Sequence, residues 1–191
     1  MNCSSELEPF INQQLSPDII KMTDYSNLKL GEDDQDIEVS TSAENAAAAV
    51  AMFSQARRTI EIYTHELDPR IYNQSGCVDA LKTFVLNNTS AKIRILIRHP
   101  DRTLRSGHRL ISLARHLSSY IEMRVIHEDY SGPPDAFLLV DTHGMLHLQE
   151  GDRYEGICNF YNPRMATELS HRFNEVWEHS TEIAEFRRIY V

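Results

Sequence analysis

Residues 133–148 have the sequence PPDAFLLVDTHGMLHL, and this stretch decides the fold. Prolines break the chain ahead of an apolar run, Ala136 to Val140, which has the length of a buried strand. The residues Thr142-His143-Gly144 are typical of a hairpin turn, and a second apolar segment follows at 145–148. The stretch therefore predicts two antiparallel strands joined by a tight turn.

Three strand patterns precede this hairpin, and helical patterns separate them. The strands are expected at 59–65 (TIEIYTH), 92–99 (KIRILIRH) and 121–127 (IEMRVIH). Helices are expected from Ser42 onward, behind a capping box of Thr41 and Glu44, and then at 77–86 and 104–117. Strands that alternate with helices favour a parallel sheet, so the added hairpin makes the predicted sheet mixed.

The chain after the hairpin predicts one more strand and a long helix. A short strand is expected at 156–160, and a helix begins at Pro163, a residue favoured in the first turn. Its helical spacing points Leu169, Phe173 and Trp177 inward. The predicted fold class is an α/β sandwich with a mixed central sheet flanked by helices, formed by a single domain over residues 39–191.

The 191-residue chain has a net charge of −9, and this charge is unevenly distributed. Residues 1–38 hold nine acidic and two basic residues, so this acidic leader carries −7 and is expected to be partly disordered. The remaining residues are nearly neutral. The overall acidity argues against a protein that coats nucleic acid or anionic membranes through bulk charge.

Cysteine content and hydropathy restrict the possible classes of protein further. The cysteines Cys3, Cys77 and Cys158 are few and widely spaced, which fits neither a disulfide framework nor a zinc site with paired cysteines. No segment reaches the roughly 18 apolar residues of a transmembrane helix, and the N-terminus lacks the pattern of a signal peptide. We expect a cytoplasmic protein with no transmembrane segment.

The order of these elements resembles one half of a phospholipase D-like fold, over about residues 40–180. The resemblance depends on the opening helix, the segments TIEIYTHEL, RILIR, PDAFLLVD and GICN, and the closing helix through Trp177. In that family the signature HxKxxxxD supplies a histidine that attacks phosphorus and a lysine that stabilises phosphoryl charge. Such sites combine two copies of the motif, so the resemblance implies that this single-copy chain is a homodimer.

The signature is incomplete in this chain. Asp141 matches its aspartate, but the histidine position falls on Pro134 and the lysine position on Ala136. Gly156 and Asn159 match a later glycine and asparagine, although their spacing from Asp141 is longer than the family's. The resemblance therefore implies the fold without a catalytic residue and without a cofactor. It leaves Asp141, Gly156 and Asn159 as candidate ligand-binding positions.

The chain resembles a degenerate member of the kind found as a bacterial domain that is sometimes fused to an acetyltransferase, although this chain has no acetyltransferase motif. Other histidines offer no clear replacement for the nucleophile. His143 and His147 lie on the hairpin, and neither is followed by a lysine two residues later.

Each of the three predicted strands before the hairpin ends in a histidine: His65, His99 and His127. Ligands of open α/β sheets bind beyond the carboxyl ends of the strands, so these histidines and Arg98 are candidates to line one crevice. Three imidazoles can also hold zinc. However, His99 and His127 continue the apolar faces of their strands and His65 does not, so we predict no metal site. An enzyme of different chemistry that uses these histidines, with or without a metal, remains the alternative.

Arg102, Arg105 and Arg109 fall at positions i, i+3 and i+7, the spacing of one helical stripe. Guanidinium groups suit phosphates and carboxylates, so the stripe indicates a weak site for a phosphate-containing ligand, either a nucleic acid or a lipid headgroup. A solvated face, or one that docks the acidic leader of the same or a partner chain, is the preferred explanation of the stripe. Nucleic acid is the less favoured partner because exposed aromatic residues do not alternate with the arginines.

Common nucleotide-binding and hydrolase motifs are absent from the sequence, including GxGxxG, the P-loop and GxSxG. The leading hypothesis is a catalytically inactive phospholipase D-like domain that binds a ligand or a protein partner as a homodimer.

Overall fold

A computed structural model describes residues 24–105, 107–130 and 132–182 of the chain. Within these residues, eight strands form one sheet in the order β1-β7-β6-β5-β2-β3-β4-β8. The strands are β1 (Ile37–Val39), β2 (Thr59–Thr64), β3 (Lys92–Ile97), β4 (Ile121–Val125), β5 (Ala136–Val140), β6 (Gly144–Leu148), β7 (Gly156–Asn159) and β8 (Thr181–Glu182).

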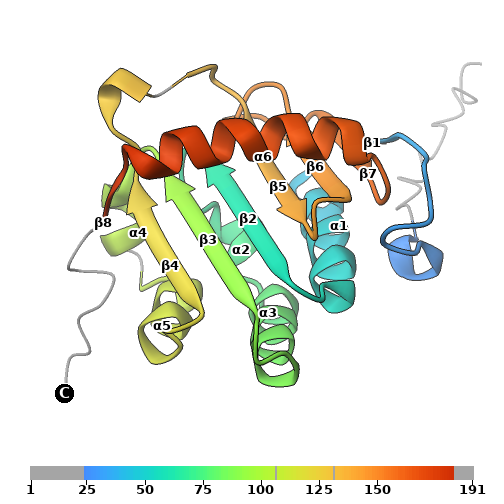
Figure 1. Ribbon diagram of the computed structural model, residues 1–191, viewed down its shortest axis with the longest axis horizontal. Coiled ribbons are helices and arrows are strands. Elements are labelled where there is room, and N and C mark those ends of the chain that lie inside the picture. The colour runs from blue at the N-terminus through green and yellow to red at the C-terminus, as the bar shows by residue number, and fades with distance from the viewer. Residues whose placement is uncertain (1–23, 106, 131, 183–191) are drawn as a thin grey trace, which may run out of the picture.

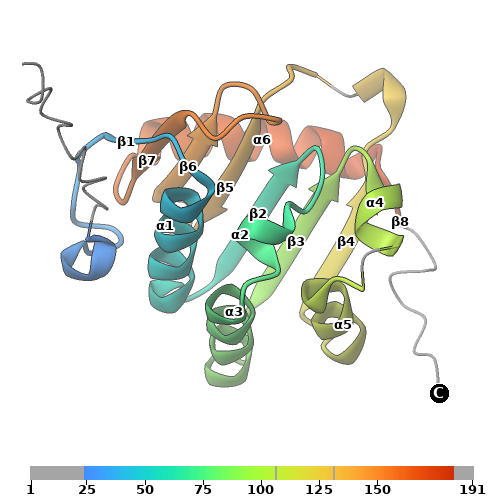
Figure 2. The same ribbon diagram turned by 180° about the vertical axis from the view of Figure 1, so that it is seen from behind.

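Helices cover both faces of this sheet (Figures 1 and 2). The long helix α6 (Pro163–Glu178) crosses one face alone, as Figure 1 shows. The opposite face carries α1 (Ser42–Gln55), α2 (Pro69–Tyr72), α3 (Ser75–Asn87), α4 (Pro100–Arg105) and α5 (Arg109–His116). The fold is therefore an α/β sandwich with a mixed central sheet flanked by helices, as the sequence predicts.

The predicted hairpin lies beside the parallel strands β2, β3 and β4. β5 pairs antiparallel with β2 on one side and with β6 on the other. The turn between β5 and β6 places Asp141 and Thr142 at φ of 53° and 60°. Two successive residues with positive φ are the geometry of the tight turns whose twist matches that of paired strands. This turn fixes the register of β5, a strand buried on both faces.

Side-chain alternation on the central strands divides the core into two layers. Ile60 and Ile62 of β2 pack toward α1, α2 and α3, whereas Tyr63 packs toward α6 with Phe137 of β5. The Tyr63 and Phe137 rings are stacked at 4.9 Å between centroids. Both layers contain large, fully buried side chains, and burial of apolar area is the main stabilising term of such a fold.

The capping box predicted at the start of the first helix is present in α1. Thr41 accepts a hydrogen bond from the Glu44 backbone N–H at 3.2 Å, and the Glu44 carboxylate accepts one from the Thr41 backbone N–H at 3.0 Å. The two bonds satisfy donors that the first helical turn leaves unpaired. They fix the residue at which α1 begins, and with it the position of Asn45 in the next turn.

The single helix predicted at 104–117 is wrong: α4 ends at Arg105 and α5 begins at Arg109. Gly107 lies between them at a φ of 63°, a conformation that a helix cannot contain. His108 then caps α5, and its side chain accepts a hydrogen bond from the Leu110 backbone N–H. Arg102, Arg105 and Arg109 therefore do not form a stripe on one helix.

The acidic leader contributes to the sheet through its last residues. The predicted domain boundary between residues 38 and 39 falls inside β1, which pairs antiparallel with β7. Ahead of β1, the Gly31 backbone N–H donates to the Phe160 carbonyl at 2.9 Å. Residues 1–23, to which most of the disorder prediction applies, lie outside the described residues, as does Cys3.

No helix in the described part of the chain combines the length and hydropathy needed to cross a membrane. The two described cysteines, Cys77 and Cys158, are buried free thiols, and burial raises the pKa of each to about 12. Both are therefore unreactive core residues at neutral pH.

Candidate functional site

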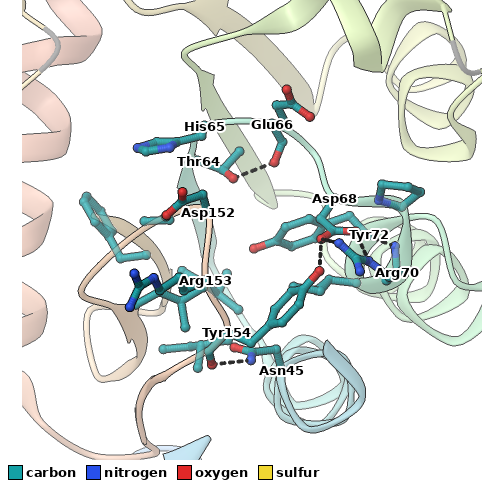
Figure 3. A pocket seen from close by; sticks show the side chains of 18 of the residues that line it. Asn45, Thr64, His65, Glu66, Asp68, Arg70, Tyr72, Asp152, Arg153 and Tyr154 are labelled. Atoms are coloured by element: carbon teal, nitrogen blue, oxygen red, sulfur yellow. Dashed lines mark hydrogen bonds and ion pairs between the residues drawn. The ribbon is translucent and has the colours of Figure 1, made fainter. Parts of the chain in front are cut away.

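A cavity of about 560 Å³ opens at the carboxyl end of β2 (Figure 3). Its walls come from α1, α2, the ends of β2 and β3, the hairpin strands β5 and β6, and the loop at 151–154 that follows β6. This volume lies in the range of small-molecule sites. The carboxyl ends of parallel strands are also where open α/β sheets bind their ligands.

The cavity floor is aliphatic. Ala136 and Leu138 of β5 lie beside Leu146 and Leu148 of β6, in register across the hairpin. All four are buried. Because alternate residues of a strand point to opposite faces, this set points toward α1 and α2. The floor is thus a direct product of the hairpin turn.

An ion pair between Asp68 and Arg70 forms one wall of the cavity. The Asp68 carboxylate caps α2 by accepting from the Arg70 backbone N–H at 2.8 Å, and it also binds the Arg70 guanidinium at 3.1 Å. The Tyr154 hydroxyl donates to the same carboxylate at 2.5 Å (Figure 3). Burial acts to raise the pKa of Asp68, but the bonds from Arg70 and Tyr154 outweigh it and leave the pKa below its usual value. The Asp68 carboxylate is therefore ionised, and Arg70 and Tyr154 already donate hydrogen bonds to it.

Two polar side chains lie deeper in the cavity. Asn45 of α1 is fully buried, and its amide nitrogen donates to the carbonyls of Thr41 at 2.8 Å and Tyr154 at 2.9 Å. Its amide oxygen has no hydrogen-bond partner among the described residues. The hydroxyl of Tyr72, a buried residue of α2, points into the cavity (Figure 3). Burial raises the pKa of Tyr72, so its hydroxyl stays protonated.

His65 and His99 lie on the rim, with ring centroids 6.3 Å apart. Burial, together with the charge of Arg98 and the neighbouring His99, holds the pKa of His65 below its usual value. His65 is therefore neutral at pH 7. Gly151 makes room for this ring, since a Cβ at that position would lie 3.0 Å from it.

The remaining rim residues are charged. Arg102 binds Glu66 at 3.1 Å, and Arg153 binds Glu150 at 2.8 Å. Asp152 also lines the cavity. Arg102 is the one member of the predicted arginine stripe that reaches this site, whereas Arg105 and Arg109 are exposed elsewhere.

The structure brings together two of the three strand-end histidines. His127 follows β4, two strands away from β2, and its exposed ring lies near Asp129 and Tyr130. The zinc site that three such histidines could build is therefore not formed. In the described ranges no group of three or more histidine, cysteine, aspartate or glutamate side chains is arranged to hold a metal ion.

Arg98 lies next to the cavity but points to the α6 face of the sheet. Its guanidinium donates to the Tyr63 hydroxyl at 3.2 Å and to the Pro133 carbonyl at 2.9 Å. It thereby holds the segment that enters β5, and it acts on the cavity through the charge that it places near His65.

The signature aspartate, Asp141, lies at the opposite end of β5 from the cavity. Its carboxylate accepts hydrogen bonds from the backbone N–H groups of Arg57 at 2.6 Å, Arg58 at 2.7 Å and Thr59 at 2.8 Å. The structure thus gives Asp141 a role in anchoring β2, and it does not bring this residue to the candidate site.

Gly156 and Asn159 of β7 also make contacts that stabilise the fold and do not reach the cavity. A Cβ on Gly156 would lie 2.3 Å from the His147 carbonyl oxygen, so glycine permits the close pairing of β6 and β7. The buried Asn159 amide donates to Asp36 at 2.7 Å and to Asp34 at 3.3 Å. It binds the acidic leader rather than the cavity.

A second buried polar cluster lies across the sheet from the cavity. Asp135, the residue between Pro134 and Ala136, accepts a hydrogen bond from Arg172 of α6 at 2.5 Å and lies 2.8 Å from His147 Nε2. Burial acts to raise the pKa of Asp135, but these two partners outweigh it and leave the pKa below its usual value. The cluster joins α6 to the hairpin.

Sequence patterns did not single out the deep residues of the cavity. Asn45 lies in an alanine-rich helix, and Tyr72 lies in a four-residue helix that is too short to leave a periodic pattern in the sequence. The pair Asp68-Pro69 is one available signal, since a capping aspartate before proline is typical of a helix start.

Comparison with known proteins places the chain in a sequence family. A model of DUF7931, a domain of unknown function, matches residues 41–189. None of the curated proteins matches the chain in sequence.

Solved structures share the fold at low sequence identity. TrmBL2, an archaeal chromatin protein with a novel mode of DNA binding, is 15% identical with a TM-score of 0.57, over 78% of this chain and 54% of its own. This chain therefore spans about half of the TrmBL2 chain.

Two nucleases match over nearly their whole length. Nuc from Salmonella typhimurium, a phospholipase D family member, is 16% identical with a TM-score of 0.51. NucT from Helicobacter pylori is 11% identical with a TM-score of 0.53. Each match covers 78% of this chain and 99% of the nuclease. At these identities the likeness shows the fold alone, which is phospholipase D-like.

Proposed function

Since the chain belongs to the DUF7931 family and has a phospholipase D-like fold, we propose that it is a catalytically inactive domain that binds a small ligand in the cavity beside β5. The observation that carries the proposal is the position of Ala136. The resemblance to the signature HxKxxxxD assigns the family's lysine to this residue, and Ala136 is part of the cavity floor. An apolar contact surface thus takes the place of the lysine that stabilises phosphoryl charge in the family.

The residues around Ala136 supply no replacement for the lost chemistry. Pro134 takes the histidine position, and its carbonyl accepts a hydrogen bond from the Gly151 N–H at 2.6 Å. Asp135 points to the other face, where Arg172 and His147 bind it. Among the residues that the structure describes, no lysine lines the cavity. Binding without phosphodiester hydrolysis is therefore the function that the site supports best.

The retained volume favours binding over a purely structural role. Small-molecule sites are mostly apolar hollows with a few placed polar groups, and this cavity combines an aliphatic floor with Asn45, Tyr72 and a charged rim. A fold that had lost both catalysis and binding would gain stability by filling the space, because cavities weaken a core.

A ligand screen tests the proposal. ¹⁵N-labelled protein is titrated with a fragment library, and shifts of the backbone amide signals of residues 64–72 and 151–154 report binding. The variant Ala136→Phe fills the floor and is expected to abolish these shifts. Ala51→Phe makes the same enlargement on the outer side of α1, in a different surface groove, and serves as the matched control. Hydrolysis of bis(p-nitrophenyl) phosphate by the wild-type protein would contradict the absence of phosphodiesterase activity.

An enzyme of different chemistry is the competing proposal, and the pairing of His65 with His99 at the rim favours it. Both rings are close enough to share one substrate. A turnover assay on any fragment that binds separates the two proposals: conversion of the fragment that is lost in His65→Gln and His99→Gln supports the enzyme.

The homodimer remains a proposal that depends on the family resemblance. Light scattering on the purified full chain gives its mass directly. A monomer at all concentrations tested would remove the dimer from the proposed function and leave the cavity, which one chain builds alone, unaffected.

A further inference from the structure

Each arginine that lines the cavity is already bound to a carboxylate. Arg70 is paired with Asp68, Arg102 with Glu66 and Arg153 with Glu150. Arg70 makes this contact through both Nε and a terminal nitrogen, the two-pronged geometry that it would otherwise offer to a phosphate. An entering anion would have to displace these carboxylates or approach them against their repulsion.

The described residues of the inner part of the cavity offer no positive charge. The lysine position of the family holds Ala136, and the neutral His65 adds none. The polar groups at depth are the Asn45 amide oxygen and the Tyr72 hydroxyl. The first can only accept a hydrogen bond, and the second can accept or donate one. A buried acceptor without a partner costs free energy, which a ligand that donates to it would recover.

Apolar surfaces fill the remainder of the lining. Leu138, Leu146 and Leu148 of the floor line the cavity together with the Tyr72 and Tyr154 rings. This combination suits a ligand with a flat or aliphatic body that carries one polar end. The arrangement is the reverse of a phosphate site, in which cations and backbone N–H groups point at the ligand.

We propose that the cavity binds an uncharged small molecule whose apolar body lies on the leucine floor and whose N–H or O–H group donates to the Asn45 amide oxygen. The inference rests on the proposed binding function and names its ligand class. It departs from the phosphate-containing ligand that the arginine stripe suggests, because the cavity arginine of that stripe, Arg102, is bound to Glu66.

Three probes of similar size separate the ligand chemistries. N-methylbenzamide carries an N–H donor, methyl benzoate has nearly the same shape without a donor, and phenyl phosphate carries the anion. Each is titrated into ¹⁵N-labelled full-length protein, and the backbone amide shifts of residues 64–72 and 151–154 give the Kd. N-methylbenzamide is expected to bind about tenfold more tightly than either of the others, as for a site built around a hydrogen bond.

A pair of tyrosine variants checks the position of the polar end. Tyr72→Phe removes the hydroxyl that would donate to the carbonyl oxygen of N-methylbenzamide while its N–H donates to Asn45, and is expected to weaken this probe about threefold to tenfold, the range for one lost hydrogen bond. Tyr130→Phe removes a hydroxyl far from the cavity, beside His179, and is expected to change nothing. Thermal melting of both variants shows whether they fold like the wild type.

The outcomes distinguish the inference from the proposed function. Equal binding of methyl benzoate overturns the role of the donor, and tighter binding of phenyl phosphate overturns the preference for an uncharged ligand. Both results leave binding in the cavity intact. If none of the probes shifts the cavity signals, and the fragment library also fails to do so, the inference and the proposed function fall together.

Discussion

The Asp141 carboxylate accepts a hydrogen bond from the Thr59 backbone N–H at 2.8 Å, which joins the end of β5 to the first residue of β2. The N–H groups of Arg57 and Arg58 donate to the same carboxylate. Asp141, which the resemblance matches to the signature aspartate, is therefore bound to the backbone that leads into the neighbouring strand. These bonds give Asp141 a structural role in the fold.

Replacing Asp141 with alanine is expected to lower the free energy of unfolding by roughly 2 kcal/mol. Three backbone donors lose a charged acceptor, and alanine is also strained at the φ of 53° that Asp141 adopts. Urea unfolding measures the loss. Asp141→Asn tolerates this φ and keeps one acceptor oxygen, so its cost should be smaller. Loss of ligand binding in the cavity at unchanged stability would contradict the structural role.

Arg172→Met is expected to destabilise the protein by roughly 3 kcal/mol, since it takes the guanidinium from a buried carboxylate. Asp135 is 5% exposed, and it would keep only His147 as a partner. Arg164→Met, at an exposed position in the first turn of the same helix, is the matched control and should be nearly neutral. Chemical denaturation of both variants measures the difference. Equal stability of the two would show that Asp135 needs no cation.

Acid is expected to destabilise the protein through His108, whose pKa burial lowers to about 4. A histidine with a folded-state pKa below its unfolded value of 6.5 contributes stability that is fully present above pH 6.5 and is lost as the pH falls toward 4. The loss amounts to about 3 kcal/mol at pH 4. Thermal melting between pH 7 and pH 4 records it together with the titration of the carboxylates.

The variant His108→Asn isolates the contribution of this histidine. Asparagine can still cap α5 by accepting from the Leu110 N–H, but it does not titrate. The stability of the variant should therefore fall less steeply than that of the wild type between pH 6.5 and pH 4. Parallel pH profiles of the two proteins would show that His108 is not responsible.

The elements that the sequence predicts correctly are those with strong periodicity. The strands at 59–65, 92–99 and 121–127 and the hairpin at 136–148 are confirmed to within two residues at each end. The prediction of one helix at 104–117 is wrong because the apolar spacing of the sequence continues across Gly107, whereas the positive φ of Gly107 interrupts the helical backbone there. Local conformational preference decided this boundary against the hydrophobic pattern.

The candidate site was partly predictable. His65 and His99 follow from the rule that ligands bind beyond the carboxyl ends of parallel strands, and both line the cavity. The deep residues Asn45 and Tyr72 do not follow from this rule. Their placement depends on how α1 and α2 pack against a loop about a hundred residues later in the chain. Contacts between such distant segments leave no periodic signal in a single sequence.

Asn159→Ala is expected to release the described part of the acidic leader from the sheet. The Asn159 amide holds Asp34 and Asp36, and its oxygen accepts from the Tyr161 N–H at 2.8 Å, so alanine leaves three groups without their partner. Trypsin should then cut after Lys29 severalfold faster than in the wild type, because proteolysis follows the population of the opened state.

The matched control is Asn87→Ala, at an exposed position in the last turn of α3. It should leave the cleavage rate at Lys29 unchanged. Faster cleavage in Asn159→Ala alone would show that Asn159 holds the leader against the sheet. If the two variants are cut at the same rate, the pairing of β1 with β7 is sufficient to hold the leader, and the bonds to Asp34 and Asp36 add little.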